Sequence, residues 1–112
     1  MGISTHVLDL AHGRPAAGIA VTLERQAGGN WREAGTGTTD RDGRVAALLP
    51  DGQDAQPGTY RLRFDVGSYF AAGGVAHFHP VIEITFTAAA DSPKYHVPLL
   101  LSPFGYSTYR GS

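Results

Sequence analysis

The last seven residues of the chain carry side chains suited to holding a small molecule. Residues 106–112 read Tyr-Ser-Thr-Tyr-Arg-Gly-Ser, with two tyrosines, one arginine and no acidic residue. Chain ends are usually poorly ordered and bland in composition, so solvation alone does not explain this tail. Just before it, residues 95–103 form an apolar run with one histidine, His96. The run and the tail are predicted to form one wall of a small-molecule site.

Such a site must be supported by a folded domain. The spacing of the apolar residues predicts that this domain is built from strands. Within residues 59–66, Tyr60, Leu62 and Phe64 alternate with polar residues. This period of two is typical of a half-buried strand. The same reasoning predicts strands over residues 3–10, 19–24, 31–38, 45–49, 59–66, 80–86, 88–90 and 95–101.

Turn signals and one short helix separate these strands. Asp-Gly at residues 42–43 is a strong turn signal, because glycine accepts a positive φ, and Arg44 leaves this turn at the start of a strand. Residues 66–72 have helical character, which a Gly-Gly pair ends. Pro98 cannot donate to a ladder, so its strand is expected at a sheet edge or with a bulge.

Seven or eight short strands with almost no helix predict an all-β sandwich in a single domain, 1–112.

The composition excludes several classes of function. A net charge of −1 leaves no basic stripe, so nucleic acid and anionic membrane surfaces are poor partners. No apolar run reaches the roughly 18 residues of a membrane span. The first residues lack the features of a signal peptide, and the cytoplasm is the expected location. The absence of cysteine excludes disulfides, thiolate metal ligands and a cysteine nucleophile.

Other histidines and serines offer weaker alternatives. His77 and His79 point the same way on a strand and could bind zinc with a third ligand. No acidic or further histidine partner stands at a recognisable spacing, so a structural or surface role is favoured and no metal or organic cofactor is expected. The serines near the chain end lack the G-x-S-x-G context of a serine hydrolase.

Three stretches carry a resemblance to a known family. They are Ser-Thr-His-Val-Leu-Asp at residues 4–9, Thr-Asp-Arg-Asp-Gly-Arg at residues 39–44, and residues 95–103 running into 106–112. Together they resemble the signatures of the transthyretin-like 5-hydroxyisourate hydrolases, from the first strand to the last residue. The terminal Tyr-Arg-Gly-Ser is the most specific part, because hydrolases of this family end in it and the hormone-carrying transthyretins do not.

The resemblance implies a transthyretin-like sandwich of two four-stranded sheets with a short helix after the fifth strand. It also implies a homotetramer, built as a dimer of dimers, with the substrate site in the channel where dimers meet. The implied reaction opens the six-membered ring of 5-hydroxyisourate, the product of urate oxidation, to give 2-oxo-4-hydroxy-4-carboxy-5-ureidoimidazoline. The residues at the family's catalytic positions are His6, Arg44 and His96, and those implied to shape the pocket and bind substrate are Tyr109, Arg110, Gly111 and Ser112.

These residue types suit the implied reaction. A neutral histidine, with an unperturbed pKa of about 6.5, can take a proton from water, and His6 and His96 are both candidates for this base. Arg44 stays protonated and presents a planar fork of donors to carbonyl oxygens of a flat ureide. Two alternatives stay open: a transthyretin-like carrier that binds a small aromatic ligand without turnover, and an interaction module that uses its sheet edges. The carrier leaves the polar residues unexplained, and the module leaves the tail unexplained.

Overall fold

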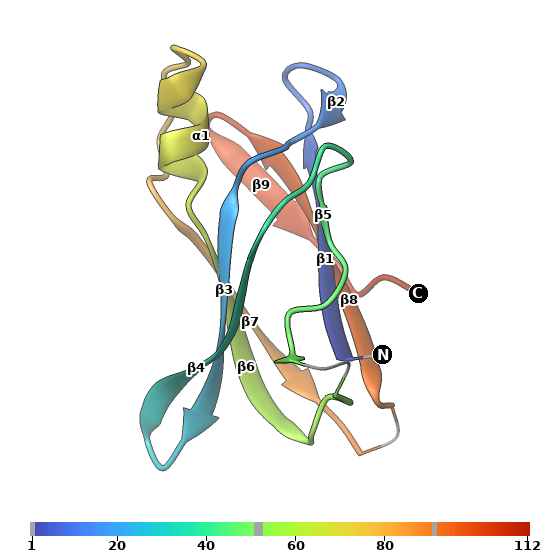
Figure 1. The fold of residues 1–112 in the computed structure, drawn as a ribbon. Helices are drawn as coiled ribbons and strands as arrows, with labels where there is room; N and C mark the ends of the chain where they lie inside the picture. Colours follow the sequence, from blue (N-terminus) through green and yellow to red (C-terminus); the bar gives the residue numbers. More distant parts are fainter. Residues whose placement is uncertain (1, 51–52, 91) are drawn as a thin grey trace.

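The computed structural model describes residues 2–50, 53–90 and 92–112, which fold into two packed β-sheets and one short helix (Figure 1). This arrangement confirms the predicted all-β sandwich. The elements in chain order are β1 (Gly2–Asp9), β2 (Arg14–Pro15), β3 (Ala20–Ala27), β4 (Asn30–Thr38), β5 (Arg44–Val45), β6 (Gly58–Phe64), α1 (Val66–Ala72), β7 (Ile82–Ala88), β8 (Lys94–Ser102) and β9 (Gly105–Thr108).

The first sheet contains the strands that carry the candidate site. Its order is β2-β1-β8-β9, and β5 also pairs with β1. Because β8 occupies one side of β1 along its whole length, the two-residue strands β2 and β5 follow one another along the other side. This sheet therefore has five strands where the resemblance implies four. The second sheet has the order β4-β3-β6-β7 and is antiparallel throughout.

The pairing of β1 with β8 is parallel and keeps one register along all of β1. Ile3, Val7 and Leu99 point into the core and have 0% of their surface exposed. Since side chains alternate along a strand, the residues between them face the opposite side of the sheet. Ser4 and His96 lie on this outer face and are half-buried.

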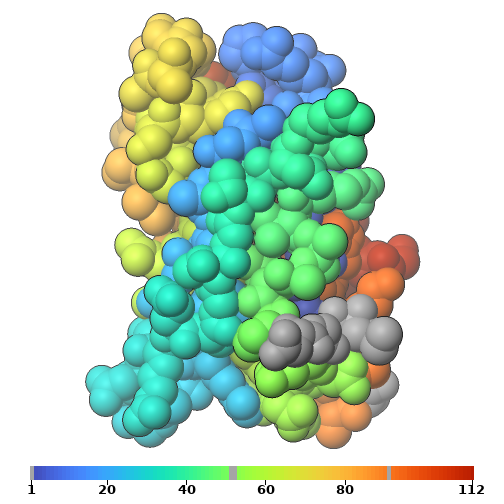
Figure 2. Space-filling view, in the orientation of Figure 1, coloured from blue at the N-terminus to red at the C-terminus, as the bar shows by residue number. Residues whose placement is uncertain are grey.

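The segment after β5 is not the strand predicted over residues 45–49, because regular pairing ends at Val45. Leu48 is buried, and its N–H donates to a carbonyl of β1 at 2.9 Å. The segment crosses the front of the sandwich against β4, as Figure 2 shows in green and teal. A Cβ added to Gly35 of β4 would lie 1.6 Å from the Leu48 carbonyl oxygen, and one added to Gly37 would lie 2.6 Å from a methyl carbon of Val45. The two glycines are therefore what lets this segment lie against the sheet.

The tail forms a strand that the sequence did not predict, since β9 pairs antiparallel with β8. Pro98 consequently lies in an interior strand, and the expected edge position is wrong. The ladder is nevertheless interrupted at this residue: it ends at Leu99↔Thr108 and resumes as a single bridge at His96↔Gly111. The Pro98 carbonyl accepts from the Thr108 hydroxyl at 2.6 Å, so the proline nitrogen also faces the tail, where no ladder bond is formed.

The helix spans the residues predicted for it. At its start the Asp65 carboxylate accepts from the backbone N–H of Ser68 at 3.2 Å and from its hydroxyl at 2.7 Å. At its end come Gly73 and Gly74, and Gly74 has a φ of +68°. Within the described ranges, no helix is long and apolar enough to cross a membrane.

The substitution Gly35→Ala is expected to displace the segment that begins with Arg44. Because the new Cβ and the Leu48 carbonyl cannot occupy the same space, the backbone after β5 must shift. Overpacking of this kind costs about 1–3 kcal/mol, and urea unfolding at a fixed protein concentration should show that loss. Gly105→Ala is the matched control, since a Cβ there meets nothing within 4 Å. Equal free energies of unfolding for the two variants would contradict this packing.

Candidate active site

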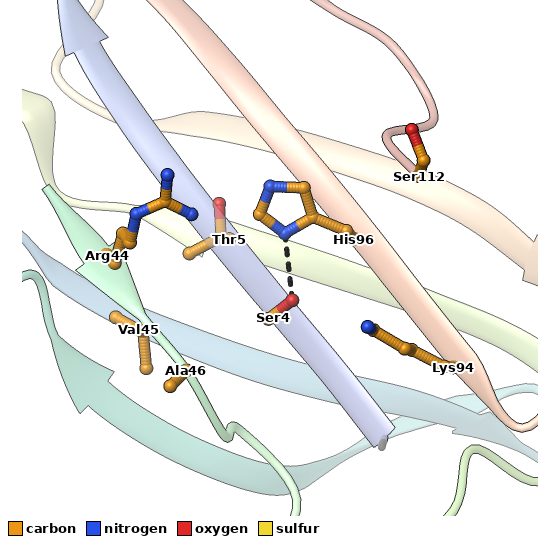
Figure 3. A pocket seen from close by; sticks show the side chains of 8 residues that line it. All are labelled: Ser4, Thr5, Arg44, Val45, Ala46, Lys94, His96 and Ser112. Carbon is orange, nitrogen blue, oxygen red and sulfur yellow. Dashed lines mark hydrogen bonds between the residues drawn. The ribbon is translucent and has the colours of Figure 1, made fainter.

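A cavity of about 300 Å³ opens where β1, β5, β8 and the chain end meet (Figure 3). Arginine, lysine and histidine side chains reach it, so it suits a polar ligand rich in carbonyl oxygens and ring nitrogens. The residues that line it are Ser4, Thr5, Arg44, Val45, Ala46, Lys94, His96 and Ser112.

His96 is held in this cavity by the neighbouring strand. The parallel register places Ser4 of β1 opposite His96 of β8, both on the outer face. The Ser4 Oγ lies 2.8 Å from His96 Nδ1. In Figure 3 the other ring nitrogen, Nε2, is directed toward Arg44. One nitrogen is therefore engaged by the protein and the other faces the cavity.

Arg44 reaches the cavity from β5, which pairs antiparallel with β1 so that Arg44 lies opposite His6. The predicted turn before it is confirmed and is held by Asp40, whose carboxylate accepts from the backbone N–H of Asp42 at 2.9 Å and of Arg44 at 3.0 Å. The bond from the Arg44 backbone is the largest cause that lowers the pKa of Asp40. Asp40 therefore stays ionised and fixes the start of β5.

His6 lies beside the cavity but is not among its lining residues. It follows Ser4 by two residues on the outer face of β1 and is half-buried. It lies opposite Pro98, two residues along β8 from His96, and its charge contributes to lowering the pKa of His96. The structure thus brings Arg44 and His96 into one cavity and places His6 at its margin.

Burial is the main cause that lowers the pKa of His96, and the charges of Arg44, His6 and Lys94 add to the effect. Burial and nearby positive charge both disfavour the imidazolium form. His96 therefore stays neutral, and able to accept a proton, to a lower pH than an exposed histidine.

The end of the chain is placed beside His96 by its backbone. The Gly111 N–H donates to the His96 carbonyl at 2.7 Å. A Cβ on Gly111 would lie 2.6 Å from His96 Cδ2, so this close approach requires glycine. Ser112 then lines the cavity. The last two tail residues are thus positioned for the predicted role in substrate binding, which stays a prediction.

Tyr109 and Arg110 lie in a different place within the chain. They line a cavity of about 250 Å³ between β7 of one sheet and β8 and β9 of the other. The Arg110 guanidinium lies over the Tyr95 ring, 4.4 Å from its centroid, and Tyr109 is 57% exposed. Neither side chain lines the cavity of His96, and their predicted role in substrate binding stays a prediction.

Sequence reasoning missed Ser4 and Lys94 as residues of this cavity. The alternation that directs His6 outward also directs Ser4 outward, so the pattern held a signal for Ser4. Lys94 precedes the predicted strand by one residue and lies two residues before His96, which gives it the same outward direction. Thr5 was also missed, but its buried hydroxyl donates to the Val97 carbonyl at 2.7 Å and joins the two strands.

In the part of the chain that the structure describes, no three histidine, cysteine, aspartate or glutamate side chains lie close enough to hold a metal ion. His77 Nδ1 lies 3.0 Å from the Val75 carbonyl oxygen, and its ring stacks on Phe70. His79 instead packs edge-on against Tyr106. The two histidines therefore have separate packing partners, in keeping with the structural role favoured for them.

A larger cavity of about 500 Å³ lies between the loop after β1 and α1 and contains a second polar cluster. The Asp9 carboxylate is bonded there by His12 Nδ1 at 2.8 Å and by the Tyr69 hydroxyl at 2.6 Å. Burial raises the pKa of Asp9, but these hydrogen bonds outweigh it and hold the pKa below its usual value. Asp9 is thus an ionised anchor that ties the end of β1 to α1, and its histidine and tyrosine partners are engaged by it.

Comparison with known proteins shows the family of this chain. The family model described as "HIUase/Transthyretin family" matches residues 3–111. The 5-hydroxyisourate hydrolase of Salmonella dublin is 46% identical over 110 residues, which cover 98% of this chain and 80% of that protein. The 5-hydroxyisourate hydrolase of Mus musculus is 46% identical over 112 residues, which cover 98% of this chain and 94% of that protein. These relatives confirm the expectation of a hydrolase.

Solved structures agree on the fold. Klebsiella pneumoniae 5-hydroxyisourate hydrolase superposes with a TM-score of 0.86 at 32% identity and covers 100% of both chains. Sea bream transthyretin, in complex with thyroxine, superposes with a TM-score of 0.90 at 32% identity and covers 99% of this chain and 95% of that one. The predicted transthyretin-like sandwich is confirmed, and the chain belongs to the HIUase/Transthyretin family.

Proposed function

We propose that this protein hydrolyses 5-hydroxyisourate to 2-oxo-4-hydroxy-4-carboxy-5-ureidoimidazoline, a step of urate breakdown. The observation that carries the proposal is the cavity in which Arg44 and His96 face one another (Figure 3). Its volume of about 300 Å³ is at the small end of the range for small-molecule sites, as a compact bicyclic substrate requires. Relatives named for this activity, at 43–46% identity, support the same reaction.

In the proposed reaction His96 acts as the general base. Its lowered pKa keeps the ring neutral near pH 7, and Nε2 faces the cavity. As a water oxygen forms a bond to the ring carbonyl carbon, Nε2 takes the water proton. The carbon–nitrogen bond of the six-membered ring then breaks, and the proton passes from Nε2 to the departing ring nitrogen. The net change is the addition of one water molecule.

Arg44 stabilises the charge that develops during this step. Negative charge builds on the carbonyl oxygen when water attacks, and a guanidinium fork fixed in advance can donate two hydrogen bonds to it. Lys94 adds positive charge at the same cavity, while His6 completes the proposed catalytic set from its position opposite Arg44. Ser112 lines the cavity at the chain end, and the Gly111 backbone next to it bonds the His96 carbonyl.

A carrier function would use the same fold, since the sea bream transthyretin that binds thyroxine superposes with a TM-score of 0.90. The discriminating feature is the charge of the site. Arg44, Lys94 and His96 converge on one cavity, whereas a passive site for an apolar ligand has no use for three such groups. This set favours the hydrolase.

The proposal includes a homotetramer, built as a dimer of dimers, with the substrate site in the channel between dimers. Its support is the family resemblance and the position of Tyr109 and Arg110, which line a cavity between sheet edges rather than that of His96. A second subunit would be needed to bring either side chain to a substrate. The cytoplasmic location stays a prediction.

The activity is tested by following the ultraviolet decay of freshly generated 5-hydroxyisourate. The native protein should accelerate the decay above the rate in buffer. His96→Asn should lose about 10²–10⁴-fold of that acceleration, because an amide cannot accept the water proton. His79→Asn is the matched control, since its ring packs against Tyr106 outside the cavity, and it should keep the native rate. Decay at the buffer rate with the native protein would rule out the hydrolase and favour the carrier.

The substitution Lys94→Gln is expected to change the pH dependence of kcat/KM. The active form has neutral His96, so the rate falls as the pH drops through the pKa of His96. The Lys94 charge lowers this pKa, so its removal should raise the pKa and move the acid limb of kcat/KM to higher pH. Arg32→Gln, at an exposed position of β4, removes one positive charge away from the cavity and should leave the acid limb in place. An acid limb that stays put or moves to lower pH in Lys94→Gln would contradict the assignment of His96 as the base.

A further inference from the structure

The hydroxyl of Ser4 contacts the imidazole on which the proposed reaction depends. Ser4 Oγ lies 2.8 Å from His96 Nδ1, on the side of the ring opposite the cavity-facing Nε2. Neither the sequence patterns nor the family resemblance gave this serine a role. A base works only if its lone pair is directed at the water, so the partner of the other ring nitrogen matters to the reaction.

The position of the His96 ring is fixed from both sides. On one side, the continuous parallel register of β1 and β8 holds Ser4 opposite His96. The buried bond from the Thr5 hydroxyl to the Val97 carbonyl locks that register one residue further on. On the other side, the Gly111 backbone bonds the His96 carbonyl and leaves no room for a side chain next to Cδ2. Ser4 therefore contacts a ring that has little freedom to turn away.

The charges around the ring favour a hydrogen on Nδ1, where the Ser4 hydroxyl can accept it. A serine hydroxyl can donate or accept, so the contact with Ser4 is compatible with either tautomer. The charged groups that act on His96 are Arg44, His6 and Lys94, and Arg44 faces Nε2. An N–H at Nε2 would point at a guanidinium, whereas a lone pair there is attracted to it. The hydrogen therefore belongs on Nδ1, which donates to Ser4 Oγ.

We propose that Ser4 is a positioning residue that, together with Arg44, holds His96 in the Nδ1–H tautomer and so presents the Nε2 lone pair to the hydrolytic water. This inference rests on the proposed function for its catalytic consequence. In the opposite tautomer Nε2 would carry a hydrogen, and it could not accept the water proton without first losing its own.

The tautomer can be measured without turnover by ¹⁵N NMR of the histidine rings in the native protein and its variants, with the His96 signals assigned from His96→Asn. The native protein should show Nδ1 protonated and Nε2 unprotonated near neutral pH. Ser4→Ala should show exchange between both tautomers, and Ser4→Thr, which keeps a hydroxyl, should restore the native pattern. Ser68→Ala removes a serine hydroxyl on α1, outside this cavity, and should leave the His96 signals unchanged.

The kinetic arm uses the same variants on 5-hydroxyisourate. Ser4→Ala should lower kcat about 10-fold to 100-fold with little change in KM, because a misdirected base forfeits part of the ~10²–10⁴-fold that such a group contributes. Ser4→Thr should recover most of this loss. Native His96 in the Nε2–H tautomer, or a Ser4→Ala variant with native kcat and native ring signals, would overturn the proposal. A native protein with the Nδ1–H tautomer but no hydrolysis would refute the proposed function and leave the positioning of His96 by Ser4 supported.

Discussion

The parallel pairing of β1 with β8 is the constraint on which the site depends. It joins the beginning of the chain to a strand near its end, and buried alternate residues such as Ile3 and Leu99 set its register. A slip of one residue would exchange the inner and outer faces of a strand. Ser4 or His96 would then point into an apolar core. The hydrophobic core and the polar site are therefore two consequences of one register.

The remaining elements place Arg44 and the end of the chain beside these two strands. Asp40 fixes the turn before β5, and the segment after β5 lies against Gly35 of β4. The short strand that carries Arg44 is therefore held at both ends. From the other side the tail closes on His96 through Gly111. Fixed donors and charges are effective in catalysis because they need no rearrangement when charge develops. The stability of this region and the proposed chemistry thus depend on the same contacts.

The sequence predicted those features that local patterns determine. Period-two alternation predicted the sandwich, and a Gly-Gly pair predicted the end of α1. Features that depend on contacts between distant segments were missed: β9, the interior position of Pro98, and the irregular path after β5, which depends on β4 glycines.

The candidate site likewise has residues that were predicted and a contact that was not. The family resemblance supplied Arg44 and His96, which the structure brings together, and the tail, of which Ser112 lines the cavity and Gly111 bonds the His96 backbone. The contact of Ser4 with His96 joins residues 92 positions apart and becomes visible only once the strands are paired.

The central claim, that this cavity holds the substrate, is tested most directly by a crystal structure with urate, the fused-ring precursor of 5-hydroxyisourate. We predict urate with its carbonyl edge at Arg44 and its ring within hydrogen-bond reach of His96 Nε2, directly or through one water. Urate bound instead beside His12 and Tyr69, with the His96 cavity vacant, would contradict the account.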